Sequence, residues 1–136
     1  MPECIFCKIV KKELPAIAVY ENDRVLAFLD LKPVHVGQTL VIPKNHSSNI
    51  YEIEESDLQA VALGVQKVAQ AIKKGLGADG VNIIMNNEKA AGQVIFHPHI
   101  HVIPRFEGDG LELWHGKEAS EESRNEAAGK IKDSLN

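Results

Sequence analysis

The most regular pattern in the chain is a series of apolar residues that recur every three or four positions between residues 56 and 77. Such spacing places side chains on one face of a helix. The series comprises Leu58, Val61, Ala62, Val65, Val68, Ala69, Ile72 and Leu76. Ser56 with Gln59 three residues later fits a capping box at the helix start, and Gly77 fits the left-handed position beyond the last turn. The sequence therefore predicts one long amphipathic helix over 56–77.

Shorter apolar runs, rich in β-branched and aromatic residues, predict the strands of a sheet. These runs cover residues 18–21, 25–29, 39–42, 81–85 and 100–106. Asn22-Asp23 suits the tight turn of a hairpin between the first two runs, and Pro43 closes the third. After residue 118 the chain is compatible with a helix but polar, which predicts a C-terminal helical tail. Together these patterns indicate an α+β fold in which the long helix packs against the sheet.

Length and charge limit the classes to which the protein can belong. The chain has 136 residues, 44% of them hydrophobic, so we expect one domain with one core. Its 19 acidic and 15 basic side chains give a formal charge of −4 without a basic tract, which argues against a nucleic-acid-binding protein. The apolar run 58–72 is interrupted by polar residues, and the N-terminus lacks a cationic start followed by an apolar stretch. We therefore expect a cytoplasmic protein that binds neither a membrane nor nucleic acid.

The segment HPHIHVIP, residues 97–104, carries three of the six histidines at alternate positions. Alternate residues of a strand share a face, and at ~3.3 Å per residue the outer two histidines would lie ~13 Å apart. One metal ion does not readily hold all three, so we expect them to have separate roles. A neutral imidazole that is held by a hydrogen bond at one nitrogen can attack a phosphate with the other. Histidines that merely decorate a strand, or a metal site built from a His-x-His pair, are the alternatives.

The segment HPHIHVIP also resembles the His-φ-His-φ-His-φ-φ signature of the histidine-triad (HIT) family of nucleotide hydrolases and transferases, where φ is apolar. The resemblance extends through CIFCKIV, VLAFLDLKP, GQTLVIPKNH, NIIMNN and AGQVIFHPHIHVIPR. It implies one HIT-like domain over 1–136, with a core over 4–106 and a C-terminal extension over 107–136. It further implies an antiparallel sheet, a homodimer, and hydrolysis of a purine nucleoside 5′-monophosphate from a leaving group through a nucleotidyl-histidine intermediate.

The resemblance also assigns roles to individual residues. His99 matches the histidine that attacks the α-phosphate, and His101 matches the one that contacts the phosphate and the leaving group. The other matched positions are Asn86, Gly92 and Gln93 along the phosphate, Asp30 at the ribose hydroxyls, and Phe6, Phe28 and Leu31 around the base. A glycine lets the backbone approach an anion closely, and amide donors can hold its oxygens. Taken singly, each Phe would be a core residue and Gly92 a turn glycine.

Cys4-x-x-Cys7, in a chain without an export signal, is more typical of a metal or redox pair than of a structural disulfide. The resemblance to bacterial-type members implies that His46 and His97 complete a Cys2His2 zinc site, with one structural Zn²⁺ per chain. Four protein ligands leave no coordination position open for a substrate. Two partly buried free thiols, with His46 on the surface, form the alternative.

Three positions depart from the family pattern. Gln38 stands where a Gly-His-x-Leu segment is common, and it can form hydrogen bonds but cannot become cationic. Val94 replaces a serine that the phosphoramidate hydrolases place near the leaving group, and Pro98 lacks an N–H for a ladder. Two rival hypotheses remain open: a nucleotide-binding regulatory protein with little turnover, and a metal-binding protein that uses His99 and His101 as ligands.

Overall fold

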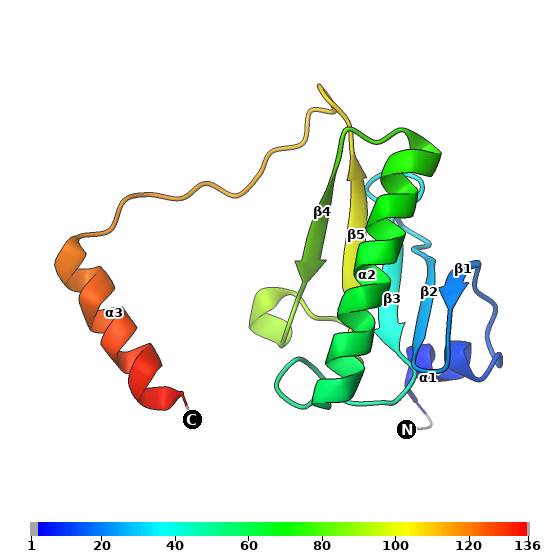
Figure 1. Cartoon of the computed structure of the whole chain (residues 1–136), viewed down its shortest axis with the longest axis horizontal. Helices are drawn as coiled ribbons and strands as arrows, with labels where there is room; N and C mark the ends of the chain where they lie inside the picture. The colour runs from blue at the N-terminus through cyan, green and yellow to red at the C-terminus, as the bar shows by residue number, and fades with distance from the viewer. Residues whose placement is uncertain (1–2, 136) are drawn as a thin grey trace.

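A five-stranded antiparallel sheet forms the centre of the molecule in the computed structural model, which describes residues 3–135 (Figure 1). Its strands are β1 (Ala18–Glu21), β2 (Val25–Leu29), β3 (Thr39–Pro43), β4 (Gly80–Met85) and β5 (Ile100–Arg105). They lie in the order β1-β2-β3-β5-β4, and each neighbouring pair is antiparallel. The predicted strands and the α+β class are confirmed.

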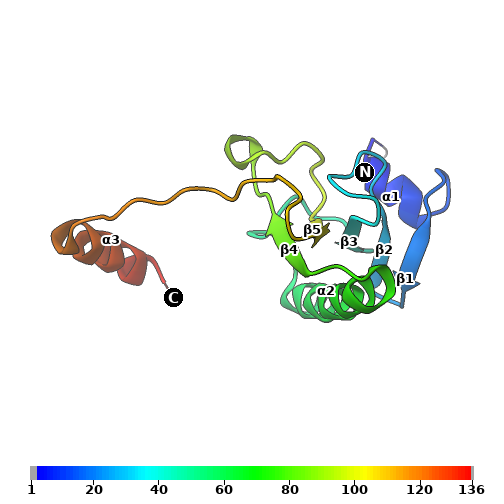
Figure 2. The same ribbon diagram turned by 90° about the horizontal axis from the view of Figure 1, so that it is seen from above.

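The chain forms three α-helices and one 3-10 turn within the described residues, and two of the α-helices cover the sheet (Figure 2). The four elements are α1 (Ile5–Val10), the long α2 (Glu55–Leu76), the 3-10 turn η1 (Lys89–Ala91) and the C-terminal α3 (Glu121–Ser134). Figure 2 shows α1 and α2 on opposite sides of the sheet, with α3 standing apart from both. Among the described residues, no helix combines the length and the apolar character that a membrane crossing requires.

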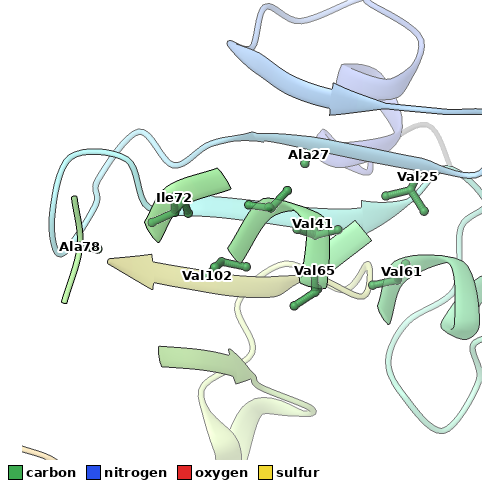
Figure 3. Close-up of a cluster of buried hydrophobic side chains, with 9 residues drawn as sticks. Val25, Ala27, Val41, Val61, Val65, Ile72, Ala78 and Val102 are labelled. Atoms are coloured by element: carbon green, nitrogen blue, oxygen red, sulfur yellow. The ribbon is translucent and has the colours of Figure 1, made fainter. Parts of the chain in front are cut away.

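The side of the sheet that faces α2 holds the larger core cluster (Figure 3). It consists of Val25, Ala27, Val41, Val61, Val65, Val68, Ile72, Ala78 and Val102. Gly64 brings the helix close to the sheet, because a Cβ built on it would lie 3.1 Å from Val25 Cγ1 and 3.3 Å from Val41 Cγ1. The apolar face predicted from the periodicity of the helix is therefore the face that packs.

The opposite side of the sheet is covered by α1. Phe6, Leu26, Phe28, Leu40 and Ile42 form its buried cluster. Neighbouring residues of β2 thus alternate between the two clusters, as the pleat of a strand requires. Leu40 is also the partner of His101 across the β3–β5 ladder, so His101 lies on the α1 side. The side of the sheet away from α2 therefore carries the histidine chemistry.

One local prediction was wrong. Helix α2 begins at Glu55 with Glu54 as its N-cap and without a capping side chain, so Ser56 does not form the capping box. The Ser56 hydroxyl instead accepts a hydrogen bond from Arg24 Nη1 at 3.0 Å. Strand β5 begins at Ile100, as predicted, so two of the three clustered histidines precede it. The left-handed Gly77, with φ of 68°, ends α2 as predicted.

Candidate active site and metal centre

The backbone bends just before β5, and this bend separates the first histidine of the cluster from the other two. The His97 N–H donates to the carbonyl of Ile95 at 3.0 Å, and Pro98 has no N–H to extend the ladder. Only His101 lies within the strand. The rings of His99 and His101 remain neighbours, with centroids 5.2 Å apart. The prediction of three histidines on one strand face is therefore corrected to a pair and a separate His97.

The fully buried ring of His97 points into a group of four potential metal ligands, formed with Cys4, Cys7 and His46. One ligand atom from each residue lies within 4.8 Å of the other three. The start of α1 brings the two sulfurs together, because Cys4 is the N-cap and its Sγ accepts the Cys7 N–H at 3.3 Å. Among the described residues this is the single group of three or more such ligands, and it includes neither His99 nor His101.

The separations within this cluster fit a tetrahedral zinc ion. The two Nδ1 atoms of His46 and His97 are 3.3 Å apart, and Cys7 Sγ lies 3.3 Å and 3.7 Å from them respectively. Cys4 Sγ lies 3.5 Å from His97 Nδ1. With ordinary zinc bond lengths, tetrahedral geometry requires about 3.3 Å between two nitrogens and about 3.6 Å between a nitrogen and a sulfur. The four side chains can therefore hold such an ion with little rearrangement.

The second nitrogen of His97 fixes its ring for this role. Nε2–H donates to the Pro43 carbonyl at 2.8 Å, so the neutral ring presents the lone pair of Nδ1 to the cluster. Burial lowers the pKa of His97 to about 4, against the opposing effect of the hydrogen bond to Pro43. A neutral imidazole with an unprotonated Nδ1 is the form that binds a metal ion.

The same residue also orients the next histidine. His99 Nδ1–H donates to the backbone carbonyl of His97 at 2.7 Å, which leaves the lone pair on His99 Nε2. Burial lowers the pKa of His99, so the uncharged form is favoured. The Phe6 ring packs against it in a T-shaped arrangement at a centroid distance of 5.1 Å. An uncharged imidazole with one nitrogen fixed and the other free is chemically able to act as a nucleophile.

His101 belongs to a second hydrogen-bonded group, with Gln38 and Asp30. Gln38 Nε2 lies 3.1 Å from His101 Nδ1 and 3.2 Å from Asp30 Oδ2. Burial and the neighbouring His99 lower the pKa of His101, whereas Asp30 acts in the opposite direction. Asp30 keeps part of its surface exposed and also accepts the N–H of Lys32 at 2.9 Å. The structure thus brings Asp30 and His101 together, as expected for residues of one site.

The loop between β4 and β5 contains the three residues expected along a phosphate. Gly92 has a φ of 95°, and a Cβ on it would lie 3.8 Å from Asn86 Nδ2, so these two residues are neighbours. Gln93, in contrast, has no free donor. Its amide donates to the carbonyls of Ser48 and Ile95, and its own N–H donates to a carbonyl within the loop. The side chain of Gln93 therefore supports the loop, and its contact with a phosphate stays a prediction.

The residues expected around a base differ in their burial. Phe6 and Phe28 pack edge to face with centroids 5.5 Å apart, and both are buried in the core of the α1 side. Leu31 is 96% exposed and lies outside that cluster. Its position beside a base therefore stays a prediction.

The sequence marked Gln38 only as a departure from the family pattern, and it did not reveal the contact of Gln38 with His101. Gln38 lies two residues before Leu40, so the two side chains share a face, and Leu40 is the partner of His101 in the β3–β5 ladder. The pairing of β3 with β5 is a long-range contact, so the register was needed to see that Gln38 and His101 share a face. The Pro43 carbonyl was equally invisible, because it is a backbone atom.

Comparison with known proteins adds sequence relatives. Residues 11–108 match the HIT domain. An uncharacterized HIT-like protein of Methanocaldococcus jannaschii is 50% identical over 107 residues, which cover 79% of this chain and 82% of that protein. Adenylylsulfatase HINT3 of Arabidopsis thaliana is 45% identical over 109 residues, which cover 80% of this chain and 55% of that protein.

Solved structures show the same fold. A crystal structure from Streptococcus mutans UA159 has a TM-score of 0.93 at 39% identity and covers 100% of this chain and 87% of that one. A Zn-bound histidine triad family protein from Mycobacterium smegmatis has a TM-score of 0.79 at 37% identity, over 98% of this chain and 99% of that one.

Proposed function

The chain belongs to the HIT domain family, and on this basis we propose that it is a nucleotide hydrolase that cleaves at the α-phosphate. The substrate class is a purine nucleoside 5′-monophosphate joined to a leaving group. The observation that carries the proposal is the hydrogen bond from His99 Nδ1 to the His97 carbonyl, because it leaves Nε2 as a directed, uncharged nucleophile. The name of the Arabidopsis relative, an adenylylsulfatase, supports an adenylyl substrate.

The reaction has two steps. In the first, the lone pair of His99 Nε2 forms an N–P bond, and the bond from phosphorus to the leaving group breaks with its electron pair. The nucleotidyl-histidine carries a positive charge on the ring, which the His97 carbonyl stabilises at Nδ1–H. In the second, water attacks phosphorus, the N–P electrons return to His99, and a proton passes to solvent. The products are the nucleoside monophosphate and the free leaving group.

Replacement of His99 by asparagine tests this role. We expect turnover of adenylylsulfate to fall at least about a thousandfold, because no other group replaces the nucleophile. Binding of AMP should be retained, as measured by calorimetry. His115→Asn is a matched control, since His115 is an exposed histidine away from the site. Unchanged turnover in His99→Asn would refute the hydrolase mechanism, and a wild-type protein that binds AMP without turnover would indicate the regulatory alternative.

The rest of the site completes the proposal. Asp30 receives the ribose hydroxyls with lone pairs that Lys32 and Gln38 leave free. Asn86 and the backbone at Gly92 hold phosphate oxygens, and the open backbone of a glycine permits that approach. His101 donates to the phosphate or the leaving group. The two buried phenylalanines and the exposed Leu31 border the base.

We also propose one structural Zn²⁺ per chain, held by Cys4, Cys7, His46 and His97. The tetrahedral separations and the Zn-bound relative support this site. The ion would fix the His97 backbone, whose carbonyl orients the nucleophile, and would not contact substrate. Metal analysis of protein purified without added zinc should give one equivalent, lost in the Cys4→Ser/Cys7→Ser double variant. Wild-type protein free of metal would exclude the site.

A homodimer is the remaining part of the proposal. The edge strand β4 exposes Ile83 and Ile84, and α2 exposes Leu63. Exposed apolar residues beside an unpaired strand edge are typical of a protein interface. Sedimentation equilibrium should give twice the chain mass of 14.9 kDa. A species of single-chain mass at micromolar concentration would contradict it.

A further inference from the structure

The buried side chain of Gln38 is hydrogen-bonded at both polar atoms, and its partners fix which way the amide points. Its oxygen accepts the backbone N–H of Val34 at 2.7 Å. Its nitrogen faces Asp30 Oδ2 at 3.2 Å and His101 Nδ1 at 3.1 Å. A backbone N–H can only donate, so the oxygen must face Val34 and the NH2 group must face the carboxylate and the ring. Both amide protons are thereby used.

This orientation determines where His101 carries its proton. Because Gln38 can only donate to Nδ1, the neutral ring must have its proton on Nε2. A second proton on Nδ1 would place two N–H donors against each other, that of His101 and that of Gln38. The Gln38 amide cannot turn over to relieve this without losing its hydrogen bond from the Val34 N–H. The titratable groups that face His101 are His99, at a centroid distance of 5.2 Å, and Asp30, whose Oδ2 is 4.0 Å from Nδ1. Asp30 alone would favour the cation, and Gln38 stands between the two.

We propose that Gln38 is a positioning residue that holds His101 uncharged with Nε2–H directed to the substrate, and thereby restricts the enzyme to leaving groups that depart as stable anions. The inference rests on the proposed hydrolase function and names the class of conjugate it accepts. Sulfate and phosphate are such leaving groups. Amines are not.

The balance of the first step explains this restriction. When the P–O bond to sulfate or phosphate breaks, the electron pair leaves on oxygen as a stable anion, and a hydrogen bond from His101 Nε2–H is sufficient. When a P–N bond breaks, the departing nitrogen needs a proton at the same time. A cationic His101 could supply that proton and become neutral. An uncharged His101 would have to become an imidazolate, so the amine conjugate reacts slowly.

Nitrogen-15 NMR of the substrate-free protein tests the state of His101 without reference to activity. In the wild type at pH 7 we expect an unprotonated Nδ1 and a protonated Nε2. Gln38→Glu replaces a donor by an acceptor at that nitrogen, so we expect both nitrogens to be protonated. Gln38→Met removes the donor without adding charge and should allow both neutral tautomers. A doubly protonated ring in the wild type, or an unchanged tautomer in Gln38→Met, would overturn the inference.

Kinetics with two conjugates of AMP test the consequence. The wild type should hydrolyse adenylylsulfate with a kcat/KM at least about a hundredfold above that for an alkylamine phosphoramidate, since general acid catalysis contributes about that much. In Gln38→Glu we expect this ratio to fall at least about tenfold. Gln59→Glu, on the exposed face of α2, controls for the added charge. A ratio near one in the wild type, or a ratio unchanged by Gln38→Glu, would overturn the inference. If the wild type hydrolyses neither conjugate, the hydrolase proposal fails while the NMR result still decides the role of Gln38.

Discussion

Replacement of Cys7 by serine should destabilise the protein through loss of the metal ion and hardly at all through loss of packing. Cys7 Sγ contacts both histidine nitrogens of the cluster, at 3.3 Å and 3.7 Å. A serine hydroxyl is a poor zinc ligand, because zinc prefers the deprotonated thiolate. The side chain is only partly buried, so the exchange of sulfur for oxygen alone removes little apolar contact.

The size of the effect follows from linkage between binding and folding. Four of the six separations among the ligand atoms lie within about 0.3 Å of tetrahedral values, and all six lie within 4.8 Å, so the folded chain binds the ion with little rearrangement. An ion that binds only the folded state, at a free concentration 1,000 times its Kd, adds about 4 kcal/mol to the free energy of unfolding. For a chain of this length that corresponds to roughly 15 °C in Tm. We expect Cys7→Ser to lose most of this.

Calorimetric unfolding with and without a chelator distinguishes the two causes. In zinc-containing buffer, wild type and Cys7→Ser should differ by about 4 kcal/mol, whereas in chelator the two proteins should agree within about 1 kcal/mol. His115→Asn, which removes an exposed potential ligand outside the cluster, should match the wild type in both buffers. A difference that persists in chelator would show that Cys7 stabilises the fold by packing. No difference in either buffer would refute the metal site.

Three further substitutions test the frame around the site, each measured by urea unfolding. Gly64→Ala should destabilise by about 1 kcal/mol, because the new methyl would lie 3.1 Å from the buried Val25; a gain of about 1 kcal/mol, as at an ordinary helical glycine, would contradict the packing. Gln93→Ala should cost about 3 kcal/mol, since it leaves the Ser48 carbonyl and other loop groups without partners; a loss below 1 kcal/mol would contradict that. Arg105 lowers the pKa of Asp109, so the ion pair stabilises the fold fully above the unfolded pKa near 4, and this stabilisation is lost as the pH falls further. Asp109→Asn should therefore have a lower free energy of unfolding than the wild type at pH 7 and approach the wild type at pH 2. An equal difference at both pH values would contradict the ion pair.

The parts of the fold that depend on local pattern could be predicted from the sequence. The apolar face of α2 and the strands of the sheet follow from periodicity, and these elements lie where they were expected. Helix α1 was not predicted, because six residues are too few for a periodic signal and burial of Phe6 stabilises the turn. The capping box predicted at Ser56 was wrong, and the Ser56 hydroxyl binds Arg24, a residue distant in sequence that no local pattern indicates.

Within the site, residue type was easier to predict than geometry. The cysteine spacing and the histidine cluster indicated ligands and a nucleophile, and the four proposed ligands lie together. The period-two rule failed at His97, because the chain bends over residues 95–97 before β5 begins. Gln93 is a donor by type, but the loop uses each of its N–H groups. The role of Gln38 depends on the strand register, which no local pattern encodes.

Mass spectrometry of protein quenched during turnover of adenylylsulfate tests the central claim most directly. We expect a single adenylyl group on the peptide that contains His99, assigned to His99 by fragmentation and absent from His99→Asn. The adduct should appear and decay at rates that account for steady-state turnover. An adduct on His101, or turnover at full rate through a pathway that never modifies His99, would contradict nucleophilic attack by the imidazole that His97 orients.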